Sequence, residues 1–162
     1  SALEDWQERS WRGVQLVVNP TAGWRVRLRF PTGTEWFDEP WMADGTHALR
    51  LEVIDDAIEL GGFPPGRTYR IGLPLYLNES STLTLEGLAG RATVVAGTER
   101  TALAAGETRR LDLLAADLLA RPLAPPGPGH VVIRARPRPR QGEVSIDPET
   151  RKLLQSLGYL SN

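Results

Sequence analysis

The stretch that decides the fold is Trp24-Arg25-Val26-Arg27-Leu28-Arg29-Phe30, in which apolar and charged side chains alternate without a break. Successive side chains of a β-strand point to opposite faces, so this period of two predicts a strand with one apolar face. The opposite face carries three arginines about 7 Å apart. We therefore expect a strand that covers a hydrophobic core with one side and presents Arg25, Arg27 and Arg29 on the other.

Similar short runs recur along the chain, separated by turn-forming residues. We expect further strands at 14–18, 34–37, 48–54, 69–77, 82–86, 91–96, 98–103, 107–113 and 130–136. Hairpins between the flanking strands are predicted by the turn formers at 19–23, 87–90 and 104–106. Pro74 cannot donate a ladder hydrogen bond, so the strand that contains it is expected at a sheet edge or with a bulge.

About nine short strands with frequent turns and no βαβ alternation indicate an all-β fold, an antiparallel β-sandwich, with a barrel as the alternative. The segment 113–121 is compatible with a short helix between strands. We divide the chain into a β-sandwich domain at 1–136, a Pro- and Arg-rich linker at 137–146, and a C-terminal capped helix with its tail at 147–162. A chain of 162 residues is long enough to bury a real core as one domain.

The composition argues against several classes of function. The net charge of −1 argues against a dedicated nucleic-acid binder, and we expect no nucleic-acid partner. The longest apolar run is too short for a membrane span, and none is expected. The chain has no cysteine, which removes disulfides, thiolate nucleophiles and cysteine metal ligands. Lys152 is the single lysine beside eighteen arginines, which indicates a GC-rich bacterial genome or the recognition of planar anions.

The C-terminal segment has the pattern of a short capped helix. Asp147 is a favourable N-cap, Pro148 suits the first helical position, and Gly158 can end the helix in a left-handed conformation. A helix of about ten residues is marginal alone in water, so this one is expected to dock on something. The sequence Asp-Pro-Glu-Thr-Arg-x-x-Leu-x-x-Leu-Gly-Tyr-Leu, from Asp147 to Leu160, resembles the tails of bacterial sulfatase-like hydrolases of the alkaline phosphatase superfamily.

This resemblance implies a non-catalytic C-terminal accessory domain that supports fold, association or substrate presentation. Its implied partner is the catalytic domain of the same parent chain, and its implied location is periplasmic or extracytoplasmic. The superfamily's Cys/Ser-x-Pro-x-Arg motif is not matched, because the nearest spacing here, from Phe63 to Arg67, has Phe at the nucleophile position. No catalytic residue carries over, so we expect neither an enzyme nor a cofactor in this chain.

The densest candidate for ligand binding is the segment 35–45. Trp36 and Trp41 stand beside carboxylates there and could form a sugar-stacking platform, since an aromatic face suits the apolar face of a pyranose. The chain would then be a carbohydrate-binding module. The alternative is that both rings cap the sandwich core, where large aromatic side chains are usually found.

The polar residues offer weaker candidates for metal binding. Asp38, Glu39 and Asp44 could collect a calcium ion, but they could equally solvate a loop with a turn at its end. Histidines occur at His47 and His130, with no further ligands at the spacing of a zinc site. We expect no metal and interpret both histidines as structural or surface residues.

The arginines of 24–30 are candidates for anion binding. If Arg134 and Arg136 lay on an adjacent strand, the two sets would form a grid for sulfated or phosphorylated groups. The alternative is a solvated face on which the arginines pair with cross-strand carboxylates such as Glu52. The Arg-Pro run at 136–140 is interpreted as a linker.

Overall fold

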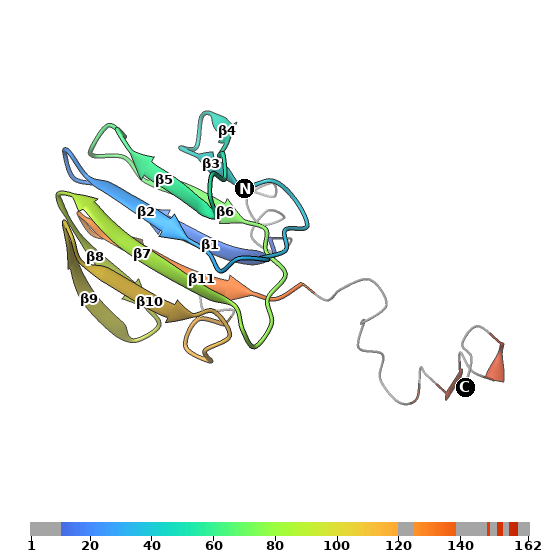
Figure 1. The fold of residues 1–162 in the computed structure, drawn as a ribbon. Helices are drawn as coiled ribbons and strands as arrows, with labels where there is room; N and C mark the ends of the chain where they lie inside the picture. The colour runs from blue at the N-terminus through green and yellow to red at the C-terminus, as the bar shows by residue number, and fades with distance from the viewer. Residues whose placement is uncertain (1–10, 120–124, 139–148, 150–151, 154–155, 159–162) are drawn as a thin grey trace.

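The computed structural model describes residues 11–119, 125–138, 149, 152–153 and 156–158. Its strands form two sheets that lie one over the other, as Figure 1 shows, which confirms a sandwich-like all-β fold. In sheet order, the seven-stranded sheet contains β4 (Ala48–Arg50), β3 (Trp41–Ala43), β6 (Tyr69–Leu73), β1 (Gly13–Val18), β11 (His130–Arg136), β8 (Arg91–Ala96) and β9 (Glu99–Ala104). In the same way, the four-stranded sheet contains β10 (Thr108–Asp112), β7 (Thr82–Ala89), β2 (Arg25–Arg29) and β5 (Ala57–Gly61).

The described residues thus form eleven strands rather than about nine. Neighbouring strands pair antiparallel except for β11 and β8, which run parallel within the described part of the sheet. A parallel pair requires a long crossover connection, and here the chain visits β9 and β10 between β8 and β11.

The core lies between the two sheets. The alternation in 24–30 is confirmed, because its four apolar side chains are buried and Arg25 and Arg29 are exposed. The seven-stranded sheet supplies the opposite wall of the core from Leu16, Ile71 and Ile133. The strands predicted at 14–18 and 130–136 are therefore also correct.

The three expected hairpins are wrong. The connections at 19–23, 87–90 and 104–106 each join a strand of one sheet to a strand of the other, since β1, β8 and β9 lie in the larger sheet and β2, β7 and β10 in the smaller. Among the described strands, sequence neighbours pair at β3–β4 and β8–β9. Turn residues show where a chain reverses, but they do not show which sheet the next strand joins.

Gly87 marks the place where the two sheets meet. Its N–H donates to the carbonyl of Glu107 at 2.9 Å, and its own carbonyl accepts the N–H of Gly106 at 2.8 Å. A Cβ at Gly87 would lie 2.1 Å from the carbonyl oxygen of Ala104. A glycine inside β7 therefore permits a close backbone approach rather than a hairpin turn.

The strand expected at 48–54 is wrong as a core element. Within this range the strand β4 covers 48–50, and Leu49 is 51% exposed. The next strand in the chain, β5, does contribute to the core, since Ile58 and Leu60 are buried. The sequence analysis missed this strand. The edge position expected for the strand with Pro74 is also wrong, because β6 lies inside the sheet between β3 and β1. The regular strand ends at Leu73, and pairing resumes after Pro74 with the bridge between Leu75 and Trp36.

The expected helices are not found among the described elements. From Leu113 to Leu119 the chain forms turns instead, with Leu118 donating its N–H to the carbonyl of Ala115 at 2.9 Å, and 120–121 lie outside the described residues. The segment 34–37 forms an isolated bridge rather than a strand. Most of the expected linker and C-terminal helix falls outside the described residues, although single residues such as Lys152 have helical backbone. Within the described chain, no helix has the length and apolarity needed to cross a membrane.

Candidate functional site

The arginines of β2 lie on the outer face of the four-stranded sheet and form a ladder of ion pairs. Arg27 lies directly opposite Glu59 of β5 and Glu86 of β7, and its guanidinium contacts their carboxylates at 3.0 and 3.2 Å. Arg29 contacts Glu86 at 2.6 Å, and Arg25 contacts Glu59 at 3.4 Å. Each carboxylate therefore bridges two guanidinium groups across the strands.

The ladder stabilises its charged forms. Hydrogen bonds from Arg29 and then Arg27 hold the pKa of Glu86 below its ordinary value, although partial burial opposes this. The pKa of Arg27 is raised, first by its hydrogen bond to Glu59 and then by that to Glu86. These contacts support the interpretation of a solvated face on which the β2 arginines pair with carboxylates of neighbouring strands. The partners are Glu59 and Glu86 rather than the expected Glu52.

The expected arginine grid is wrong because its two halves lie in different sheets. Arg134 and Arg136 belong to β11 of the seven-stranded sheet, and β2 belongs to the other layer. Arg134 is also buried, with only 2% of its surface exposed. Ligand binding by the β2 arginines stays a prediction.

The structure places Trp36 and Trp41 on opposite faces of the seven-stranded sheet. Trp36 pairs with the buried Leu75 and packs edge-to-face on Phe30 with ring centroids 5.0 Å apart, so it caps the core. Trp41 pairs with Gly72, next to the inward-facing Met42. The two rings therefore do not share one platform, and a glycan contact at either ring stays a prediction.

The acidic residues of the same segment are not gathered into one site. Glu39 pairs with Arg50 at 2.8 Å. Asp44 accepts the backbone N–H groups of His47 and Thr46, which in that order lower its pKa. Asp38 accepts the N–H of Glu39. No cluster of three His, Cys, Asp or Glu side chains suited to a metal ion occurs among the residues that the structure describes.

Both histidines take part in turns at strand starts. His47 closes the turn before β4, with its carbonyl accepting the N–H of Asp44 at 3.1 Å. His130 begins β11, and its Nδ1 accepts the N–H of Gly127 at 3.2 Å. These contacts support the structural interpretation.

Sequence reasoning missed a polar pair on the outer face of the seven-stranded sheet. Arg134 donates from Nε and Nη2 to Oε1 of Gln15 at 2.9 and 2.5 Å, and Gln15 is 3% exposed. The Trp11 ring lies over both Arg134 and Arg136, 4.6 and 4.5 Å from their guanidinium carbons. The period of two through 134 and 136 was recognised from the sequence, but its continuation to Arg138 was assigned to a linker, and the partner Gln15 lies 119 residues away in the chain.

Aromatic rings continue along the same face beyond the end of β6. Phe37 and Tyr76 pack edge-to-face with centroids 5.3 Å apart, and the guanidinium of Arg138 lies 4.5 Å from the Phe37 centroid. Trp41 lies against the backbone at Gly72, where a Cβ would come within 2.2 Å of its indole. We call this surface the arginine–aromatic face, and it consists of Trp11, Phe37, Trp41, Tyr76, Arg136 and Arg138.

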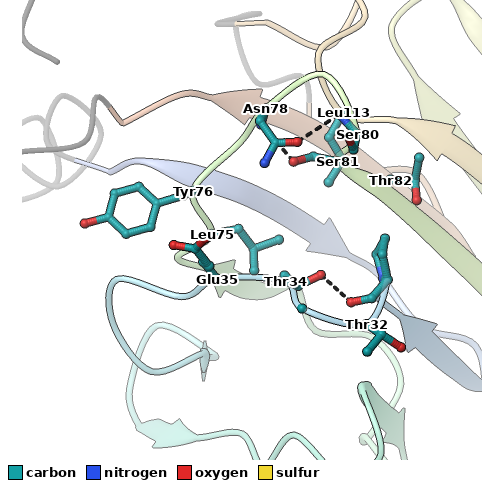
Figure 2. Close-up of a pocket in the computed structure, with 12 residues that line it drawn as sticks. Thr32, Thr34, Glu35, Leu75, Tyr76, Asn78, Ser80, Ser81, Thr82 and Leu113 are labelled. Atoms are coloured by element: carbon teal, nitrogen blue, oxygen red, sulfur yellow. Dashed lines mark hydrogen bonds between the residues drawn. The ribbon is translucent and has the colours of Figure 1, made fainter.

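The described structure contains a small pocket and a larger open hollow. Figure 2 shows the side chains that line the small pocket, among them the hydroxyl groups of Thr34 and Ser81. Its volume is about 100 Å³. Thr34 donates to the carbonyl of Pro31 at 2.6 Å, and Ser81 accepts the N–H of Asn78 at 2.8 Å, so both hydroxyls serve local turns. A second, open hollow of about 480 Å³ lies between Arg27 and the loop that contains Ile54.

No family model matches the chain, and neither the curated proteins nor the solved structures that were searched contain a match.

Proposed function

We propose that the chain is a non-catalytic accessory domain of a bacterial sulfatase-like hydrolase, which docks on the catalytic domain of the same parent chain through its C-terminal segment. The observation that carries the proposal is the exposure of Leu153 and Leu157, at 58% and 61%. The N–H of Leu157 donates to the carbonyl of Leu153 at 3.1 Å, so the two side chains lie one helical turn apart on the same side.

Two exposed leucines on one helical turn favour docking because their burial is worth about 1.5–3 kcal/mol each. Together with the resemblance at 147–160, this apolar pair supports a segment that binds another surface. The sandwich would then support the fold, the association or the substrate presentation of the enzyme, and an extracytoplasmic location belongs to the same proposal.

The first test is the parent reading frame, which should encode a sulfatase-like catalytic domain before Ser1. The second is calorimetric titration of the chain with that domain, expressed separately. Replacing both Leu153 and Leu157 with Asp should weaken binding at least tenfold. The matched control is Leu49→Asp, since Leu49 is similarly exposed but lies on the sandwich. An unrelated upstream sequence, or equal binding by the double variant and wild type, would overturn the proposal.

A second candidate function is glycan binding, and the position of Trp41 favours it. The indole is half-buried on the outer face of the sheet, where it rests on the backbone at Gly72. A ring held by the backbone in this way is preorganised for contact with a sugar. Trp41→Ala should abolish glycan binding while leaving the fold intact, whereas retained binding would remove this candidate.

A further inference from the structure

From the outer face of the seven-stranded sheet we infer a binding site for acidic glycans, meaning sugar chains that carry carboxylate or sulfate groups. The site is the arginine–aromatic face. The inference rests on the second candidate function, for which it names the ligand class, and it does not require docking on a catalytic domain. The strands that carry it are β3, β6, β1 and β11, which are neighbours in the sheet (Figure 1).

The cationic part of the site comes from alternate residues of β11 and its continuation. Arg134, Arg136 and Arg138 are two residues apart, which places side chains on one face of an extended chain about 7 Å apart. Arg134 is the buried end of this series, hydrogen-bonded to Gln15 and covered by the Trp11 ring. Arg136 is half-buried and Arg138 is exposed. The guanidinium groups of this series are therefore fixed in place at Arg134 and accessible to solvent at Arg138.

The stacking geometry suits the recognition of oxyanions. A guanidinium that lies over an aromatic ring keeps its N–H donors at its edge, where a carboxylate or sulfate can accept two of them. Arg138 lies over Phe37 in this way and has no ion pair with a carboxylate in the described part of the chain. On the opposite sheet, by contrast, Arg27 is held between two carboxylates.

The apolar part of the site lies in register with the cationic part. Trp41, Gly72, Gln15 and Arg134 form one row across four adjacent strands, each residue directly opposite the next. This row spans three interstrand distances, about 14 Å. Gly72, Gln15 and Arg134 are buried, so the parts of this face that a sugar chain could contact are Trp41 at one end of the row and Arg138, four residues beyond Arg134. A stacking side chain and an exposed arginine thus lie on the same outer face.

The test is calorimetric titration of the full chain with three hexasaccharides at low salt. The probes are a chondroitin sulfate, an oligogalacturonate and the neutral cellohexaose. We expect binding of at least one acidic probe, weakened by added salt, and at least tenfold weaker binding of cellohexaose. The two acidic probes distinguish sulfate from carboxylate as the recognised group.

Two variants of Arg138 and one control connect the binding to this face. Arg138→Gln should weaken binding of the acidic probe at least fivefold, and Arg138→Lys should not restore it fully, because an ammonium group lacks the planar fork. The control is Arg110→Gln, which removes an exposed arginine of β10 from the opposite sheet and should leave binding unchanged.

The outcomes separate this inference from the function on which it rests. Equal affinity for cellohexaose would overturn the acidic ligand class and leave glycan binding standing. Binding of none of the probes would overturn the inference and the second candidate function together. Equal losses of affinity in Arg138→Gln and Arg110→Gln would show attraction by net charge alone and would overturn the site.

Discussion

Gly87→Ala tests the arrangement of the two sheets at the point where sequence and structure disagree most. The sequence predicts a hairpin turn at 87–90. The structure places Gly87 inside β7, with its backbone bonded to Glu107 and Gly106. An added Cβ would lie 2.1 Å from the oxygen and 2.8 Å from the carbon of the Ala104 carbonyl.

The magnitude follows from the atoms that must move. Ordinary contacts of a Cβ begin near 3.4 Å, so the backbones would have to separate by more than an ångström, and no side-chain rotation can relieve the clash. Overpacking of this kind costs about 1–3 kcal/mol, and weakening two backbone hydrogen bonds adds about 0.5–1.5 kcal/mol each. Allowing for the lower unfolded-state entropy of Ala, we expect Gly87→Ala to reduce the free energy of unfolding by about 2–4 kcal/mol.

The measurement is urea denaturation followed by tryptophan fluorescence, together with the melting temperature, which should fall by about 10 °C. The matched control is Gly61→Ala in β5. Its Cβ would meet Cγ of Arg25 at 2.5 Å, but that exposed side chain can rotate away, so we expect a change below about 1 kcal/mol. If Gly87→Ala is no more destabilising than Gly61→Ala, the close approach of the two sheets at this residue is wrong.

Three further perturbations test the core and the two outer faces. Leu28→Ala should lower the free energy of unfolding by about 2–5 kcal/mol in the same assay, since Leu28 is fully buried, and a loss below 1 kcal/mol would contradict its place in the core. Glu86→Gln should cost about 1 kcal/mol at pH 7. Because the folded pKa of Glu86 is lowered, its contribution is present above its ordinary value of 4.5 and is lost as the pH falls through the folded pKa, so denaturation curves of variant and wild type should converge in acid. Gly72→Ala should displace the Trp41 indole and change the tryptophan emission, and an unchanged spectrum would argue against their contact.

Local patterns were sufficient for strands that have one face in the core. The alternation in 24–30 predicted the buried and exposed faces correctly, because burial of one face requires a period of two. The same logic misled at 48–54, where Leu49 and Val53 alternate but remain exposed. Ala57 to Gly61 was missed because the alternation of Ile58, Glu59 and Leu60 is only three residues long, although β2 pairs with the segment along its whole length.

The candidate sites show the same division. The arginines of β2 were found from sequence, but their partners Glu59 and Glu86 are distant in the chain and became evident only from the pairing of strands. Trp36 and Trp41 are near neighbours in sequence, yet the irregular chain between them turns one ring inward and the other outward.

The sequence by itself determined that this chain forms strands, where many of them lie and which side chains their inner faces carry, since these properties depend on neighbours within a few residues. The tertiary structure alone decided which strands pair, that three apparent hairpins cross between sheets, and that Trp11, Trp41 and Arg138 share one outer face. Those outcomes depend on contacts between segments far apart in the chain. Such contacts contribute free energy only when the whole sandwich has formed, so no local sequence pattern predicts them.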